Sequence, residues 1–510
     1  MINRNQPSPL GQPTLARRSL TAAMLLSVSA LACAADPATL RRQGNLDFEP
    51  CALHAGNLPY SIEAYCTEVE VAEDRSNPES RRISLGLAWV PASGDAEPDP
   101  IVMLAGGPGQ AAKQAYPMVN HAFRDARRNR DVFLLDARGT GDSNPLVCRN
   151  AAGVAAITES AEDDPNQAGE FARRCVEALS QKADLRFYGT SEHIDDLDEV
   201  RQRLAIEKIN LIGISYGTRV AQQYAARYPE HTRTVVLDAV VPNTLVLGAE
   251  HARNLEDALN QQFERCVEAG GCAEKLGNPR EQLTQVRALL EQGELEEVSY
   301  RDSTSGLWQK EKPAFGHLAL LLRMYAYSQE SATALPYLIH EASEGRYADL
   351  LAQARALVGN LTDQLYHGMQ LSVSCTEDAD DLSESSADDG TVMGPEFIAF
   401  TKAQCAVWPR GTRDPNFRQP LSNPELPVLV LSGEFDPVTP PRYGEEVVQH
   451  LPKGRHLIMK GQGHGAIGLG CMPKLYAQFL ETADAKALKP ECLGRLKPLP
   501  PFAGVYGWEP

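Results

Sequence analysis

A serine between two glycines marks an abrupt change of pattern in this chain. The segment LIGISYGT (residues 211–218) places Ser215 in a Gly-x-Ser-x-Gly sequence, directly after an apolar run and before a helix-like pattern. A tight strand-to-helix turn would explain these residues. A nucleophile elbow would explain them too, because its strained turn exposes the serine Oγ above a sheet. The five-residue pattern alone does not decide between the two.

A nucleophilic serine needs a base, an acid that orients the base, and donors for the oxyanion. Asp436 follows the apolar run PVLVLSG, and His464 lies in GQGHG after RHLIMK. Both residues therefore follow predicted strands, at the edge where parallel sheets carry their sites. The order Ser, Asp, His is that of α/β hydrolases. These observations predict a catalytic triad of Ser215, Asp436 and His464.

Other interpretations of these residues remain open. Asp238 ends another apolar strand between the serine and the histidine, so it is a competing acid. Asp436 is preferred because its loop and the His464 loop follow strands that look adjacent. Locally, His464 fits a capping loop histidine, and Asp436 fits a turn before a helix that starts near Pro440.

The elements around these residues alternate between strands and helices. Helical spacing of apolar residues marks residues 192–206 and 216–228. Apolar runs predict strands within residues 81–90, 99–110, 131–143, 209–215, 232–242 and 426–441. Such alternation predicts an α/β fold with a mostly parallel central sheet and helices on both faces.

The alternation of strands and helices stops in the middle of the chain, where helical patterns replace strands. We therefore predict an α/β-hydrolase core in two parts, residues 35–242 and 424–510, with a helical cap domain inserted at residues 243–423. Within that insertion the acidic stretch EDADDLSESSADDG (residues 377–390) is expected to form an exposed loop.

Residues 1–34 have the features of a signal peptide. Arg17 and Arg18 precede an apolar run that is short for a membrane span, and small residues at 30–34 offer cleavage sites. An N-terminal membrane anchor and lipidation of Cys33 are the alternatives. We expect a periplasmic or secreted protein, with no stable membrane association unless Cys33 is lipidated.

Cysteine usage agrees with export. Eleven cysteines become ten when Cys33 leaves with the signal peptide, and an even set is typical of oxidising compartments. Sequence alone does not fix the connectivity, but the short gaps favour neighbour pairs. The expected pairs are Cys51/Cys66, Cys148/Cys175, Cys266/Cys272, Cys375/Cys405 and Cys471/Cys492. No C-x-x-C or histidine cluster indicates zinc, so we expect neither a metal nor a cofactor.

The net charge disfavours one class of partner, nucleic acids. Hydrophobic residues make up 43% and charged residues 23% of the chain, which is ordinary for a globular protein. The formal net charge is −18, and a nucleic-acid binder needs a basic face. We therefore expect no nucleic-acid partner.

Five motifs together resemble the prolyl iminopeptidase and tripeptidyl aminopeptidase family of α/β-hydrolase serine peptidases, most of all its secreted, disulfide-containing branch. They are GGPG (106–109), DARGTGDS (136–143), GISYGT (213–218), LSGEFDPVTP (431–440) and GQGHG (461–465). The resemblance implies a serine aminopeptidase that acts on peptides through an acyl-enzyme on Ser215. It also implies that the oxyanion hole is formed by the N–H groups of Gly107 and Tyr216. Ala105 replaces the first histidine of the family's HGGPG, which weakens an assignment of strict prolyl specificity.

An aminopeptidase must also recognise a free N-terminal ammonium group, and in the resembling family acidic residues of the cap supply the carboxylates. Glu377 and Asp378 follow Cys375 directly, so we predict them as substrate-binding residues. The alternative is that they only begin a solvated loop. Arg138, in the DARGTGDS motif, is interpreted as structural.

Two other functions remain open from the sequence. A secreted esterase of small acyl or aryl esters would use the same triad. A binding protein on an inactive hydrolase scaffold is disfavoured by the intact set of serine, aspartate and histidine.

Overall fold

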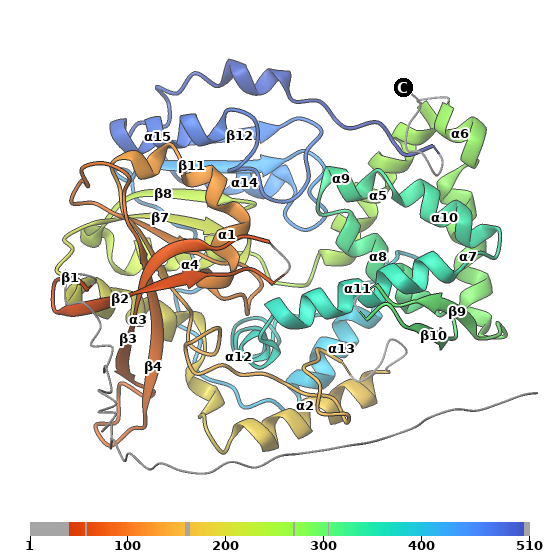
Figure 1. Cartoon of the computed structure of the whole chain (residues 1–510), viewed down its shortest axis with the longest axis horizontal. Coiled ribbons are helices and arrows are strands. Elements are labelled where there is room, and N and C mark those ends of the chain that lie inside the picture. The colour runs from red at the N-terminus through yellow and green to blue at the C-terminus, as the bar shows by residue number, and fades with distance from the viewer. Residues whose placement is uncertain (1–39, 57–58, 159–163, 269–270, 304, 504–510) are drawn as a thin grey trace, which may run out of the picture. The chain divides into compact units, whose positions relative to one another are not determined.

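A ten-stranded sheet organises the chain in the computed structural model (Figure 1). The structure describes residues 40–510 except 57–58, 159–163, 269–270, 304 and 504–510. The strand order is β1-β2-β3-β4-β6-β5-β7-β8-β11-β12. The predicted signal peptide and Cys33 lie outside the described residues.

The sheet has an antiparallel part and a parallel part. The antiparallel strands are β1 (Arg41–Gln43), β2 (Leu46–Leu53), β3 (Ile62–Ala72) and β4 (Arg82–Val90); β4 also pairs antiparallel with β6. The parallel strands are β5 (Ile101–Leu104), β6 (Val132–Leu135), β7 (Ile209–Ile214), β8 (Thr232–Asp238), β11 (Val428–Gly433) and β12 (Gly454–Met459). Runs such as IVML and VFLL are buried throughout, because helices cover both faces of this part.

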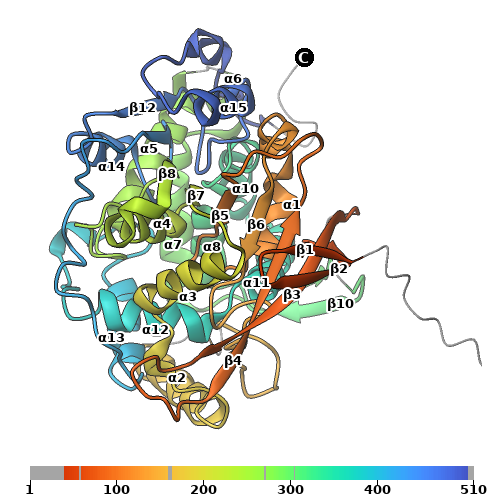
Figure 2. The same ribbon diagram turned by 90° about the vertical axis from the view of Figure 1, so that its left-hand side faces the viewer.

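Two hydrophobic clusters hold all of the core helices except α2 on opposite faces of the sheet. The core helices are α1 (Ala112–Phe123), α2 (Pro165–Leu179), α3 (Thr190–Arg203), α4 (Tyr216–Arg227), α14 (Pro441–Val448) and α15 (Met472–Thr482). One cluster joins α3, α4 and α14 to the sheet, and the other joins α1 and α15. Figure 2 shows α4 and α1 on opposite sides of β5 and β7. Short 3-10 turns lie at 126–128, 185–187, 229–231, 386–388 and 490–495.

A mainly helical segment separates β8 from β11, and we call residues 243–423 the cap segment. Its helices are α5 (His251–Glu268), α6 (Gly271–Leu276), α7 (Pro279–Gln292), α8 (Phe315–Tyr325), α9 (Gln329–Ala332), α10 (Leu335–Ser343), α11 (Ala348–Gln364), α12 (His367–Glu377) and α13 (Glu396–Cys405). It also contains a hairpin of β9 (Val298–Arg301) and β10 (Trp308–Glu311). Helices α5, α7, α8, α10 and α11 share a hydrophobic cluster of their own, and Figure 1 shows them gathered beside the sheet. Residues 40–510 form one compact unit, so a separate cap domain stays a prediction.

The prediction of an exposed loop at residues 377–390 is wrong for three carboxylates. Glu377, Asp378 and Asp388 are at most 3% exposed. Helix α12 continues through Glu377, and arginines from other parts of the chain reach the two aspartates. Other side chains of the stretch, among them Asp380 and Glu384, are exposed as expected.

Five disulfides confirm the predicted neighbour pairing. They join Cys51–Cys66, Cys148–Cys175, Cys266–Cys272, Cys375–Cys405 and Cys471–Cys492. The fourth links α12 to α13 within the cap segment. Within the described ranges no helix is both long and apolar enough to cross a membrane.

The α12–α13 bridge is expected to stabilise the protein more than the short bridge does. The Cys375–Cys405 bridge spans 30 residues and the Cys266–Cys272 bridge spans 6. In the loop-entropy model, opening them costs about 3.5 and about 2 kcal/mol of unfolding free energy, respectively. Chemical denaturation of the two Cys→Ser double variants measures both values. An equal or reversed order would contradict this role for the longer bridge.

Candidate active site

Ser215 occupies a strained turn between β7 and α4. Its φ is 56° and its ψ is −125°, a conformation that non-glycine residues rarely adopt. The flanking glycines are required by space: a Cβ at Gly213 would stand 2.3 Å from the Gly217 carbonyl oxygen, and a Cβ at Gly217 would stand 2.2 Å from that of Leu104. The turn therefore has the geometry of a nucleophile elbow.

His464 and Asp436 meet at the ends of two neighbouring parallel strands. Asp436 follows β11 and His464 follows β12, and these strands pair directly. His464 Nδ1 lies 2.8 Å from Asp436 Oδ2. Asp436 also accepts hydrogen bonds from the N–H groups of Val438 and Thr439 and from the Thr439 hydroxyl, at 2.8–2.9 Å. The carboxylate is thus fixed on one side and aimed at the imidazole on the other.

The two groups shift each other's protonation. Burial alone would raise the pKa of Asp436, but the charge and hydrogen bond of His464 and the backbone N–H groups lower the pKa below its usual value. Burial alone would lower the pKa of His464, but the Asp436 charge and hydrogen bond raise it above its usual value. A histidine made more basic in this way suits a general base that takes a proton from serine.

Asp238, the competing acid, performs a different task. Its carboxylate accepts the backbone N–H groups of Ala466 and Ile467 at 2.8–3.0 Å. Its backbone oxygen accepts the Ser215 N–H at 2.9 Å. Burial raises the pKa of Asp238 to about 6, although these N–H groups oppose the shift. Asp238 therefore supports the Ser215 turn and the segment after His464, whereas Asp436 contacts the His464 ring.

The GGPG loop (residues 106–109) lies against the serine. A Cβ built on Gly106 would stand 3.1 Å from the Ser215 Cβ. In the described part of the chain, no acceptor takes a hydrogen bond from the N–H of Gly107 or of Tyr216. Free N–H groups beside a nucleophile are what an oxyanion hole requires. This arrangement is compatible with the predicted oxyanion donors, whose role stays a prediction.

The cap segment is attached to both flanks of this arrangement. The Tyr366 N–H donates to the Gly109 carbonyl oxygen at 2.9 Å, on the side of the GGPG loop. The His464 N–H donates to the Tyr327 carbonyl oxygen at 2.7 Å, and the two rings meet edge to face at 5.0 Å. The position of the cap segment and the position of the catalytic loops are therefore coupled.

Glu377 is buried beneath the turn rather than exposed in the cap. Its carboxylate accepts the Thr190 N–H at 2.7 Å and the Thr190 hydroxyl at 3.0 Å. The Thr190 hydroxyl in turn lies 2.6 Å from the Tyr216 hydroxyl, so Glu377 is linked to the residue that follows Ser215. Burial raises the pKa of Glu377 to about 7, with Arg219 opposing and Asp378 assisting the shift.

Asp378 is held by two arginines. Arg219 Nη1 lies 2.9 Å from one of its oxygens, and Arg418 Nη2 lies 2.7 Å from the other, which also accepts the Leu247 N–H at 2.8 Å. Contacts of this kind join α4 to the ends of the cap segment. Binding a substrate ammonium group would require Glu377 or Asp378 to leave these partners, and their predicted substrate role stays a prediction.

Arg138 agrees with the structural role predicted for it. The side chain is fully buried and makes a two-point contact with Asp196, with both N···O distances at 2.7 Å. It also donates to the carbonyl oxygens of Glu73 and Phe187. The nitrogen atoms of its guanidinium group are thus engaged in hydrogen bonds to groups of the protein.

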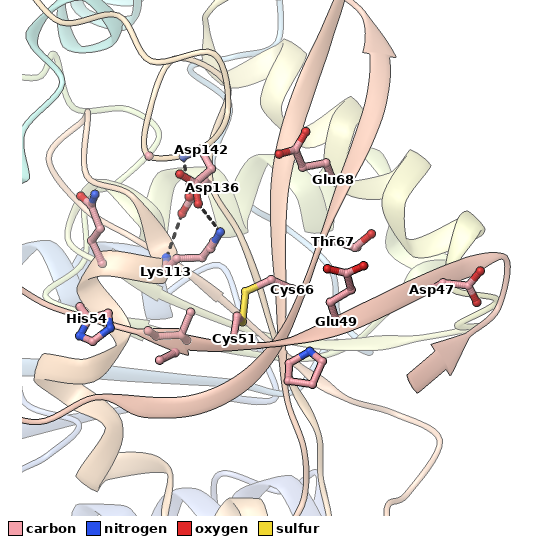
Figure 3. Close-up of a pocket in the computed structure, with 15 residues that line it drawn as sticks. Asp47, Glu49, Cys51, His54, Cys66, Thr67, Glu68, Lys113, Asp136 and Asp142 are labelled. Carbon is pink, nitrogen blue, oxygen red and sulfur yellow. Dashed lines mark hydrogen bonds and ion pairs between the residues drawn. A yellow bond between two sulfur atoms is a disulfide. The ribbon is translucent and has the colours of Figure 1, made fainter. Parts of the chain in front are cut away.

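A cavity of about 570 Å³ lies beside β2 and β3 (Figure 3), and none of Ser215, Asp436 and His464 lines it. Its acidic lining includes Glu49, Glu68 and Asp142, and Lys113 pairs with Asp142. Asp136 accepts the N–H groups of Lys113 and Asp142 at 2.9 and 3.1 Å, and burial raises the pKa of Asp136 to about 6. We assign these contacts to the support of the DARGTGDS loop rather than to the reaction.

Sequence reasoning missed two residues beside the predicted triad. Thr439 donates to Asp436, and its hydroxyl lies 3.3 Å from His464 Nδ1. An aspartate followed three residues later by a threonine is typical of a turn in which the aspartate accepts nearby N–H and O–H groups, and this spacing could have revealed the role. The Tyr327 carbonyl that receives the His464 N–H had no signal in the sequence, because it comes from a distant helical segment.

These groups are the ones that acyl transfer by a serine requires. The His464–Asp436 pair is formed, but among the described residues no hydrogen bond joins the Ser215 hydroxyl to His464, and the three catalytic roles stay predictions. The N–H groups of Gly107 and Tyr216 are available for the negative oxygen of a tetrahedral intermediate.

Comparison with known proteins agrees with an α/β-hydrolase fold and with a serine hydrolase. A family model described as the alpha/beta hydrolase fold matches residues 99–470, a range that includes Ser215, Asp436 and His464. Serine protease Hip1 of Mycobacterium tuberculosis is 26% identical over 468 residues, covering 85% of this chain and 88% of that protein. Tripeptidyl aminopeptidase of Streptomyces lividans is 24% identical over 501 residues, covering 92% and 90%. Proline iminopeptidase of Neisseria gonorrhoeae is 27% identical over 151 residues, covering 29% and 34%.

Replacing each acid by its amide should separate the roles of Asp436 and Asp238. Asp436→Asn removes the charge that holds and stabilises His464, so kcat should fall by about 10⁴-fold. Asp238→Asn keeps a carbonyl oxygen for the backbone N–H groups, so kcat should fall by less than about 100-fold. Steady-state kinetics on one substrate measures both, with circular dichroism as the folding control. An equal loss in the two variants would identify Asp238 as a triad member.

Glu377→Gln should stabilise the protein, and the gain should depend on pH. The folded pKa of about 7 lies above the ordinary 4.5, so the native glutamate loses stability as the pH rises from about 4.5 to about 7. The glutamine does not titrate, and its relative gain should reach roughly 1–3 kcal/mol above pH 7. Denaturation at pH 5 and pH 8 measures the difference.

Asp378→Asn is the matched control for that experiment. It leaves the buried Arg219 without its charged partner, so it should destabilise the protein by roughly 3–5 kcal/mol. Stabilisation by Asp378→Asn, or an equal effect of Glu377→Gln at both pH values, would contradict the electrostatic roles assigned here.

Proposed function

The chain belongs to the alpha/beta hydrolase fold family as a serine hydrolase, and on this premise we propose that it is an exported serine aminopeptidase. It releases single residues or short fragments from the free N-terminus of peptides, through an acyl-enzyme on Ser215. The similarity to the tripeptidyl aminopeptidase of Streptomyces lividans over 92% of this chain supports the proposal. The similarity to serine protease Hip1 supports the choice of a peptide substrate.

One observation carries the exopeptidase part of the proposal. The cap segment is hydrogen-bonded to the GGPG loop through Tyr366 and to the His464 loop through Tyr327. Because the cap segment is attached on both sides of the Ser215 turn, it limits the length and the course of a substrate peptide that lies across the serine. Such a restriction favours chain ends and short peptides over cleavage in the middle of a protein.

The proposed chemistry uses the groups at the turn. Ser215 Oγ attacks the peptide carbonyl while His464 takes its proton, and Asp436 stabilises the charged imidazole. The Gly107 and Tyr216 N–H groups hold the oxyanion, and losing one such donor typically costs about 100- to 1000-fold in rate. His464 then gives its proton to the leaving amine, and water hydrolyses the acyl-enzyme.

Export is the second part of the proposal. Five disulfides support folding in an oxidising compartment, since bridges of this kind are rare in a reducing cytosol. The basic and apolar pattern of residues 1–34 supports a cleaved signal peptide. Edman sequencing of the exported protein identifies the mature N-terminus.

Acetylation of the substrate's N-terminus should lower kcat/KM strongly. A free ammonium group can pair with a carboxylate, whereas the neutral acetamide cannot, and a desolvated charge contact is worth about 2–5 kcal/mol. We therefore expect a loss of at least about 30-fold. The measurement compares free and acetylated aminoacyl and tripeptidyl arylamides, with simple aryl esters beside them.

Two controls complete that experiment. A serine-directed phosphonate should label the native protein but not Ser215→Ala, which should be inactive and still folded. If Glu377→Gln leaves the discrimination against acetylated substrates unchanged, the ammonium group binds elsewhere. Equal cleavage of free and acetylated arylamides would contradict the aminopeptidase, and cleavage of esters alone would favour the esterase.

A further inference from the structure

Four half-buried side chains of the cap segment gather beside His464. They are His251, Arg323, Tyr327 and Phe397, and we call them the Arg323 cluster. The Tyr327 ring lies 5.0 Å from the His464 ring. The Phe397 ring lies 5.6 Å from His251 and 5.1 Å from the Arg323 guanidinium carbon. The cluster therefore connects the end of α8 to the catalytic histidine.

Arg323 differs from the arginines that hold the cap segment in place. Arg219 and Arg418 are paired with Asp378. Over the described ranges, by contrast, no carboxylate oxygen lies within 4.0 Å of an Arg323 nitrogen. The face of Phe397 offsets only part of the cost of removing a guanidinium from water. A half-buried arginine without a carboxylate can still accept an anion from outside.

The positive charge of Arg323 affects the pKa values of two side chains near His464, those of His251 and Tyr327. Burial, together with the positive charges of Arg323 and His464, lowers the pKa of His251 to about 3, while the charge of Asp436 opposes the shift. Burial raises the pKa of Tyr327, while the charge and hydrogen bonding of Arg323 oppose that shift and the charge of Asp436 adds to it. His251 is therefore neutral at physiological pH, and the positive charge of the cluster resides on Arg323.

The position of the cluster indicates which part of a substrate it meets. In acyl transfer by a serine and a histidine, the histidine protonates the leaving amine, so the leaving group lies beside the imidazole. The Arg323 cluster contacts His464 through Tyr327, whereas the GGPG loop lies on the Ser215 side. A group bound by Arg323 therefore belongs to the amine that leaves.

We propose that Arg323 is a specificity-determining residue that binds a carboxylate of the leaving group, so that the enzyme prefers substrates with a carboxylate directly after the cleaved bond. The planar fork of arginine suits a carboxylate. The carboxylate is either the α-carboxylate of a single leaving residue or the side chain of a leaving Asp or Glu. This inference rests on the proposed aminopeptidase function.

Two substrate pairs test the proposal and separate the two sources. One pair is a peptide whose single leaving residue ends in a free carboxylate or in an amide. The other is a longer peptide amide with Glu or Gln directly after the cleaved bond, whose position mass spectrometry establishes. For at least one pair, the native enzyme should favour the carboxylate by about 10- to 100-fold in kcat/KM, the usual size of a hydrogen bond to a charged group.

Variants assign that preference to Arg323. In Arg323→Gln the preference should fall to near unity, while kcat/KM for the neutral partners changes by less than about 3-fold. Arg323→Lys should retain part of the preference because it keeps the charge but loses the fork. Arg287→Gln is the matched control: this cap arginine lies 4.7 Å from the Phe315 ring and pairs with Glu291, and its loss should leave the preference unchanged.

Each remaining outcome overturns the proposal. It is wrong if the native enzyme shows no preference in either pair, or if Arg323→Gln keeps the preference. In both cases, cleavage of the neutral free-amine peptides leaves the aminopeptidase function intact. If none of the peptides is cleaved while Ser215 still reacts with the phosphonate, the aminopeptidase function fails and the inference fails with it.

Discussion

The buried residue Asp238 holds the Ser215 turn and the segment after His464 at once, and the geometry of the candidate site depends on it. Its backbone oxygen receives the Ser215 N–H, and its carboxylate receives two N–H groups from the segment after His464. Strand β8, which Asp238 ends, pairs with both β7 and β11. The serine and the histidine thus take their positions from one rigid strand end rather than from two independent loops.

Much of the fold and of the site could be predicted because their signals are local. Apolar runs and helical spacing predicted the parallel strands and α4, and the steric needs of a tight turn explain why Gly213 and Gly217 flank Ser215. The preference for Asp436 over Asp238 rests on the order of the strands before Asp436 and His464, and these strands, β11 and β12, pair directly. Predicting that pairing required only the order of elements along the chain.

The environment of Glu377 and Asp378 could not be predicted, because their partners are distant in sequence. Asp378 pairs with Arg219, 159 residues away, and Glu377 contacts Thr190, 187 residues away. An acidic run is normally solvated, and nothing within residues 377–390 indicates which carboxylates meet arginines. The same limit applies to Tyr327, whose contact with His464 depends on how α8 and α9 pack.

The charged groups of the cap segment near His464 connect this segment with the proposed acyl transfer. His464 carries a positive charge when it has taken the serine proton, and a second fixed cation nearby opposes that charge. The low pKa of His251 removes one such cation, which leaves Arg323 as the positive group of its cluster. A carboxylate bound to Arg323 would neutralise that charge, and the Tyr327 ring, which contacts His464, connects this position with the imidazole.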